Sequence, residues 1–82
     1  MLPTPEEVRQ YIAEKLECEV LHVVGDGAHF EALIVSPAFE GKRMIARHQL
    51  LYAALGERMK DEIHALSMRT LTPAEYQAQA NG

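Results

Sequence analysis

Two short runs of β-branched and apolar residues, separated by a glycine-rich turn, place the strongest constraint on the fold of this chain. The first run covers residues 19–24, the second covers residues 29–35, and Gly25-Asp26-Gly27 lies between them. Such runs around a glycine turn are typical of a β-hairpin, because glycine adopts backbone angles that other residues avoid. Ser36-Pro37 ends the second run, since proline cannot donate a hydrogen bond to a neighbouring strand. The sequence therefore predicts two antiparallel strands.

Both ends of the chain carry the signature of a helix start. The pattern Thr-Pro-x-Glu occurs at residues 4–7 and again at residues 72–75. The threonine side chain can accept a hydrogen bond from the backbone of the glutamate, and the glutamate side chain can reach back to the backbone of the threonine. Proline suits the first helical position. These patterns predict helices over residues 5–16 and 73–80.

Apolar residues at helical spacing predict a further helix after the hairpin. Met44, His48, Leu51 and Leu55 fall on one face, and Gly56 is a typical residue at the end of a helix. A short helical turn over residues 57–61 and a third strand over residues 63–71 follow.

The expected element order is therefore α-β-β-α-(α)-β-α. Strands joined by a hairpin pair antiparallel, whereas strands joined through a helix usually run parallel. We therefore predict a single α+β domain over residues 1–82, with a three-stranded mixed sheet and helices packed on one face.

The composition argues against several classes of protein. With 48% hydrophobic and 24% charged residues, the 82-residue chain is ordinary for a small globular domain. No apolar run approaches the ~18 residues that are needed to cross a bilayer. The single cysteine, Cys18, cannot form an internal disulfide, which favours a reducing, cytoplasmic location. The formal net charge of -4 argues against binding nucleic acid over the whole surface. We expect a cytoplasmic protein with no membrane partner.

The sequence contains no recognisable set of catalytic residues. Cys18 follows the expected end of the first helix, where backbone carbonyls disfavour a thiolate, so we expect it to be unreactive. There is no nucleophile elbow and no phosphate-binding loop, and Asp26, Glu31 and Glu40 form no acid/base pair. We therefore expect that the chain is not an enzyme.

The histidines offer the most chemistry, because neutral imidazole is the commonest metal ligand in proteins. His29 begins the expected second strand and His64 lies at the start of the third, so both would lie at one end of the sheet. Two imidazoles supply only half of a four-coordinate metal site, and a partner would have to complete it. A structural histidine beside apolar neighbours is the alternative for His64. His48 is expected to be packed with its nitrogens hydrogen-bonded, and His22 receives no role.

Three cations, Lys42, Arg43 and Arg47, gather around the expected start of the central helix. A helix N-terminus adds a partial positive charge, which favours an anion. The cluster is compatible with a solvated face, with an acidic protein partner or with a nucleic-acid site. A nucleic-acid site is the least supported of the three, because there is no Gly-x-x-Gly clamp and Phe39 is expected in the core.

Six motifs are spread along nearly the whole chain: Gly25-Asp26-Gly27-Ala28-His29-Phe30, Val35-Ser36, Phe39-Glu40-Gly41-Lys42, Arg47-His48-Gln49-Leu50, Ile63-His64-Ala65-Leu66 and Thr70-Leu71-Thr72-Pro73. In sequence and in spacing, these motifs resemble those of the BolA/IbaG family. The resemblance implies a fold like that of a class II KH domain, which agrees with the element order predicted above.

The resemblance also implies a function. Members of this family partner monothiol glutaredoxins and share a [2Fe-2S] cluster with them, in iron-sulfur trafficking, iron homeostasis and stress response. Some bacterial members are described as DNA-binding transcriptional regulators. The family's characteristic histidine falls on His64, and His29 is the candidate for its second ligand, which comes from the loop between the first two strands. The isolated chain would hold no tightly bound cluster and would be a monomer or a weak homodimer.

Overall fold

A computed structural model describes residues 3–26, 28–59 and 65–81 of the chain. The expected element order is confirmed, and expected boundaries that fall on described residues differ from the observed ones by at most one residue. Residues 60 and 61, the expected end of the short helical turn, lie outside the described residues. The expected first residues of the third strand, 63 and 64, lie outside the described residues. The elements are α1 (Pro5–Lys15), β1 (Val20–Gly25), β2 (Phe30–Val35), the 3-10 turn η1 (Pro37–Phe39), α2 (Met44–Leu55), the 3-10 turn η2 (Gly56–Met59), β3 (Leu66–Leu71) and α3 (Pro73–Asn81).

The three strands form the predicted mixed sheet in the order β1-β2-β3. β1 pairs antiparallel with β2, and β2 pairs parallel with β3. Phe30, the first residue of β2, pairs with Gly25 on one side and with Leu66 on the other. The β1–β2 turn and the start of β3 therefore lie at the same end of the sheet.

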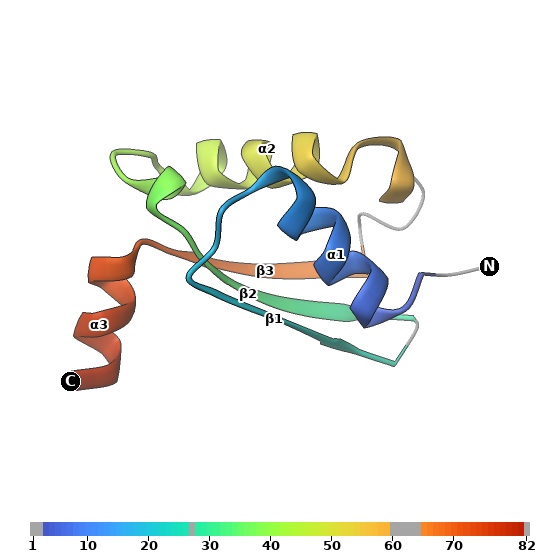
Figure 1. The fold of residues 1–82 in the computed structure, drawn as a ribbon, viewed down its shortest axis with the longest axis horizontal. Coiled ribbons are helices and arrows are strands. Elements are labelled where there is room, and N and C mark those ends of the chain that lie inside the picture. Colours follow the sequence, from blue (N-terminus) through green and yellow to red (C-terminus); the bar gives the residue numbers. More distant parts are fainter. Residues whose placement is uncertain (1–2, 27, 60–64, 82) are drawn as a thin grey trace.

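Two helices, α1 and α2, cover one face of the sheet (Figure 1). Their apolar stripes meet the inward-facing side chains of the strands in one buried core: Val8, Ile12, Leu16, Leu21, Phe30, Ala32, Ile34, Phe39, Leu51, Leu55, Met59 and Leu66. The prediction that all helices pack on one face is wrong for α3. This helix begins beyond the end of β3 and extends toward the opposite side of the sheet (Figure 1). The chain leaves the end of β3 in a direction away from α1 and α2, so α3 does not join the layer that these two helices form.

The helix ends follow the predicted chemistry. At the start of α1, the Glu7 backbone N–H donates to the Thr4 hydroxyl, and the Thr4 backbone N–H donates to the Glu7 carboxylate. Gly56 ends α2 with a φ of +57°, a conformation that favours glycine. Within the described ranges, no helix is both long and apolar enough to cross a membrane.

An arginine caps the outer edge of each edge strand. Arg9 Nε donates to the Leu21 carbonyl on β1 at 3.1 Å, and the Arg47 guanidinium donates to the Thr70 carbonyl on β3 at 3.1 Å. Unpaired carbonyls at a sheet edge are sites where a foreign strand can add. The two arginines therefore protect the sheet against unwanted pairing.

Candidate functional site

The β1–β2 turn holds His29 by its backbone and leaves its side chain exposed. One carboxylate oxygen of Asp26 accepts hydrogen bonds from the backbone N–H groups of Ala28 and His29, both at 2.9 Å. These bonds, that from His29 first, lower the pKa of Asp26, because they favour its charged carboxylate. The next residue, Phe30, is buried. An anchored turn on one side and a core residue on the other thus fix where the imidazole leaves the chain.

The register of the sheet brings the starts of β2 and β3 together. Phe30 pairs with Leu66, so His29 and Ala65, which directly precede these two residues, lie at the same end of the sheet. His64, the other predicted ligand, belongs to residues 60–64, which lie outside the described residues. The structure confirms that β2 and β3 begin at the same end of the sheet, as the two-histidine site requires. The contact between the two imidazoles stays a prediction.

His29 is the described member of the predicted pair of metal ligands, and its side chain is exposed. In the part of the chain that the structure describes, no group of three or more His, Cys, Asp or Glu side chains could hold a metal ion. Imidazole nitrogen is an established ligand of iron in [2Fe-2S] centres. This exposed edge can therefore offer His29 as one ligand, and other ligands would have to come from His64 and from a partner.

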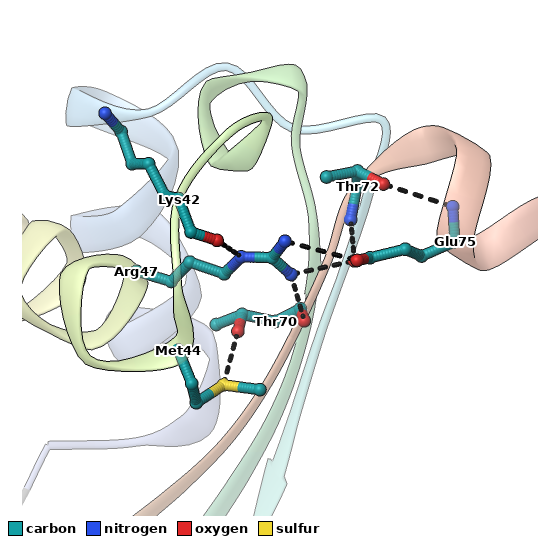
Figure 2. A network of polar contacts seen from close by, with 6 residues as sticks. All are labelled: Lys42, Met44, Arg47, Thr70, Thr72 and Glu75. Carbon is teal, nitrogen blue, oxygen red and sulfur yellow. Dashed lines mark hydrogen bonds and ion pairs between the residues drawn. The ribbon is translucent and has the colours of Figure 1, made fainter.

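Arg47 does not belong to an exposed basic patch, which corrects the sequence-based assignment. It is 8% exposed, and its guanidinium lies among backbone and carboxylate oxygens (Figure 2). Its Nε donates to the Lys42 carbonyl at 2.8 Å, and its terminal nitrogens donate to the Thr70 carbonyl at 3.1 Å and to both carboxylate oxygens of Glu75 at 2.7 and 3.2 Å. All three nitrogens of the Arg47 guanidinium therefore donate hydrogen bonds to acceptors within the chain. Arg47 is therefore a structural residue that joins α2, β3 and α3.

Glu75 connects this arginine to the start of α3. Its carboxylate accepts from the Thr72 backbone N–H at 2.8 Å, and its own N–H donates to the Thr72 hydroxyl at 3.1 Å, as the capping pattern predicts (Figure 2). Hydrogen bonds from Arg47 and then from the Thr72 backbone lower the pKa of Glu75 from 4.5 to about 2. The same carboxylate thus caps α3 and links the start of this helix to Arg47 of α2.

The exposed cations at the start of α2 are Lys42 and Arg43. Arg43 is the residue that precedes the helix, and its side chain makes no capping hydrogen bond. Met44 and Ile45 follow, with exposed fractions of 54% and 74%. Phe39 is fully buried, as predicted. The patch available to a partner is therefore smaller than the sequence indicated, and it borders apolar side chains.

Two other histidines and the cysteine lie away from the β1–β2 turn. His48 is half-buried, which agrees with the predicted packing, and its ring lies edge-on to Tyr52. Its Nε2 is buried and has no hydrogen-bond partner among the described residues, which is contrary to expectation. His22 is exposed on the uncovered face of the sheet. Burial raises the pKa of Cys18, against a smaller lowering effect of Arg9, which agrees with an unreactive thiol.

The sequence reasoning missed two positioning residues. Arg47 precedes Leu51 and Leu55 at four-residue spacing, so its place on the buried face of α2 could have been found from that spacing. Asp26, three residues before His29, has the spacing at which an aspartate side chain binds the following backbone N–H groups. Both signals were present in the sequence and were given other meanings.

Comparisons with known proteins agree with the predicted family. The family model for BolA-like protein matches residues 12–75. "Acid stress protein IbaG" of Escherichia coli (strain K12) is 35% identical over 71 residues, which cover 85% of this chain and 84% of that protein. "DNA-binding transcriptional regulator BolA" of Haemophilus influenzae is 42% identical over 55 residues, which cover 67% of this chain and 53% of that protein. The crystal structure of a bol-like protein from Babesia bovis superposes with a TM-score of 0.84 at 31% identity, and the match covers 98% of this chain and 96% of that one. This chain therefore belongs to the BolA-like protein family.

Proposed function

We propose that this chain is a non-catalytic adaptor that shares a [2Fe-2S] cluster with a monothiol glutaredoxin. The observation that carries the proposal is the exposed, backbone-anchored imidazole of His29 at the edge where β2 and β3 both begin. His29 and His64 would ligate iron from this side, and thiolates of the partner and of glutathione would complete the site. When bound, the cluster would be a cargo that the two proteins exchange.

Several features suit this role. A neutral imidazole binds iron without adding charge, and histidine in place of cysteine raises the reduction potential of a [2Fe-2S] cluster. Asp26 fixes the His29 backbone through the turn, so little conformational entropy has to be lost there when a partner docks. The imidazole at this end of the sheet is therefore accessible, and the backbone that carries it is held in place.

The histidine ligands can be tested by reconstitution with a monothiol glutaredoxin, glutathione, iron and sulfide. We expect His64→Ala and His29→Ala each to remove the change in visible absorption and circular dichroism that the wild-type chain causes. His22→Ala is the matched control, because it removes an exposed imidazole from a different part of the surface and should behave as the wild type does. Far-ultraviolet circular dichroism would verify that each variant is folded.

Retention of the full spectral change by both His29→Ala and His64→Ala would contradict the proposed ligands. A wild-type chain that causes no change with the glutaredoxin would contradict the shared cluster itself.

A DNA-binding regulator is the second candidate function. Two observations favour it: the printed name of the Haemophilus influenzae relative, and the exposed Lys42 and Arg43 at the start of α2. The adaptor is the better supported, because Arg47 is withdrawn from this surface and the net charge is -4.

The DNA-binding candidate makes a salt-dependent prediction. Reversing the charge of Lys42 and Arg43 to Glu should weaken duplex binding and flatten the slope of log affinity against log salt by about 2, because two phosphate contacts are lost. Lys15→Glu, an exposed cation on α1, is the control and should leave the slope unchanged. Fluorescence anisotropy with a labelled duplex between low and physiological salt measures both. A wild-type chain with no affinity at physiological salt excludes this function.

A further inference from the structure

The outer edge of β3 is open along most of its length. In the part of the chain that the structure describes, β3 pairs only with β2 and is an edge strand of the sheet. Backbone groups of successive residues in a strand point alternately to its two sides. The Leu71 carbonyl accepts a backbone hydrogen bond on the β2 side, whereas the Thr70 carbonyl accepts from Arg47 on the outer side. By this alternation, the N–H and C=O groups of Leu66 and Met68 point outward, where no strand pairs with them.

One side of α2 lies beside this open edge. Lys15 of α1 and Leu50 of α2 line the same hollow, so that side of α2 faces α1. Tyr52 comes two residues after Leu50 and therefore lies on the opposite side of the helix. Met44, at a multiple of four residues from Tyr52, shares its side, and the Met44 sulfur accepts from the Thr70 hydroxyl of β3 at 3.2 Å (Figure 2). The side of α2 remote from α1 is thus next to the edge of β3.

This side of α2 is apolar and exposed. The exposed fractions of Met44, Ile45 and Tyr52 are 54%, 74% and 46%. A surface helix usually presents charged side chains to water. Arg47 is the one charged residue within α2, and it is buried. The apolar side chains and the open edge of β3 together form the β3–α2 surface.

We propose that the β3–α2 surface binds an extended segment of a partner protein, which adds a fourth strand to the sheet beside β3. Strand addition takes its affinity from main-chain hydrogen bonds and its specificity from pockets for alternate side chains. The outward groups of Leu66 and Met68 would form the main-chain hydrogen bonds. Alternate side chains of the added strand would pack on Ile45 and Tyr52, which would lose contact with water. The inference does not rest on the proposed function.

The surrounding groups define the chemistry of this segment. Arg47 already occupies the Thr70 carbonyl, so the added ladder ends before this residue. The exposed Lys42 and Arg43 lie at the same end, since the Lys42 carbonyl also accepts from Arg47. An acidic residue of the segment would face these two cations. Antiparallel pairing is the more stable per residue, and it places the start of the segment at this end. The partner is therefore an extended segment that begins with acidic residues and continues with alternating apolar ones.

A synthetic peptide tests the proposal without iron or a glutaredoxin. The probe has blocked ends and consists of two aspartates followed by alternating valine and threonine, and it is titrated into the labelled full chain up to about 2 mM. When half of the chain is bound, the amide exchange rates of Leu66 and Met68 should fall to roughly half, because their N–H groups gain acceptors. Ser67 and Arg69, whose N–H groups point toward β2, should change little. A ligand that contacts side chains alone would not produce this alternation.

Two variants separate the backbone contacts from the apolar contacts. Met68→Pro removes one outward N–H at a position where an edge strand tolerates proline, and it should weaken peptide binding about fivefold. Met68→Leu keeps this N–H and should bind as the wild type does. Tyr52→Ser leaves the sheet unchanged and should also weaken binding about fivefold. Val24→Ser, its matched control, truncates an exposed apolar side chain on β1 and should have no effect. Far-ultraviolet circular dichroism would verify folding.

A charge reversal tests the polarity of the segment. Lys42→Glu should weaken binding of the aspartate peptide about fivefold and leave binding of the same peptide with asparagines unchanged. The proposal is overturned if the wild-type amides of Leu66 and Met68 exchange as fast with the peptide as without it. It is also overturned if Met68→Pro and Tyr52→Ser bind as the wild type does, or if a single-stranded oligothymidylate binds this surface more tightly than the peptide.

Discussion

Replacing Arg47 with Met is expected to lower the free energy of unfolding by about 2–4 kcal/mol, because a buried, multiply bonded cation is removed from its acceptors. Methionine preserves the apolar part of the side chain and removes the donors. The carbonyls of Lys42 and Thr70 then lose their hydrogen-bond partners, and Glu75 loses its counter-charge. Urea denaturation followed by circular dichroism measures the change. A loss below about 0.5 kcal/mol, the scale of an ordinary surface substitution, would contradict this account.

The size of this effect follows from the position of the guanidinium. Thr70 is 1% exposed, so water cannot easily replace the bond that its carbonyl accepts from Arg47. That bond also caps the outer edge of β3, where an unpaired carbonyl would invite another strand. We therefore expect Arg47→Met to raise the tendency to aggregate as well as to lower stability. Arg47→Lys should be intermediate, because an ammonium keeps the charge but cannot reproduce the planar fork.

The pH dependence of stability at Glu75 gives a second test of the Arg47–Glu75 contact. Its pKa in the folded chain is lowered from 4.5 to about 2, chiefly by the hydrogen bonds from Arg47. A depressed folded-state pKa means that the stabilisation is fully present above pH 4.5 and is lost as the pH falls toward 2. The wild type should therefore lose stability relative to Glu75→Gln over this range. In the Arg47→Met background, the pH-dependent difference in stability between Glu75 and Glu75→Gln should be smaller, because the main cause of the pKa shift is gone.

Local chemistry accounts for most of what the sequence predicted correctly. The Thr-Pro-x-Glu pattern concerns residues within one helical turn, so the starts of α1 and α3 did not depend on tertiary structure. The glycine turn and the proline after β2 are equally local. The mixed sheet followed from connection lengths, because a hairpin forces antiparallel pairing and a helix permits parallel pairing.

What the sequence did not reveal depends on contacts between distant segments. Arg47 and Glu75 are 28 residues apart, and no local pattern indicates that they pair. Once the pairing is known, it explains why Arg47 leaves the surface patch. The placement of α3 away from α1 and α2 likewise depends on the direction in which β3 ends. The family resemblance, by contrast, drew on motifs spread over the whole chain and was confirmed by the match to residues 12–75.

The glycine at the end of β1 has a role that the hairpin pattern misjudged. The sequence suggested that the turn glycines provide positive φ, but among the described residues positive φ occurs only at Gly41 and Gly56. Gly25 is required because the chain folds back closely on it. A Cβ there would lie 2.9 Å from Cδ1 of the Phe30 ring and closer still to the backbone carbonyl of His29.

Gly25→Ala is therefore expected to lower the free energy of unfolding by about 1–3 kcal/mol, the cost of forcing an extra methyl group into a packed site. The His29 carbonyl is backbone and cannot rotate away, so relief requires the whole turn to shift and His29 to move with it. Gly41→Ala adds the same methyl group where nothing lies within 4 Å, so its own cost comes from the backbone strain at a φ of +75° and not from a close contact. Urea denaturation measures the loss for Gly25→Ala, and amide NMR shifts of Asp26, Ala28 and His29 should change in that variant but not in Gly41→Ala. Wild-type stability of Gly25→Ala with unshifted turn amides would show that the close approach does not hold this turn.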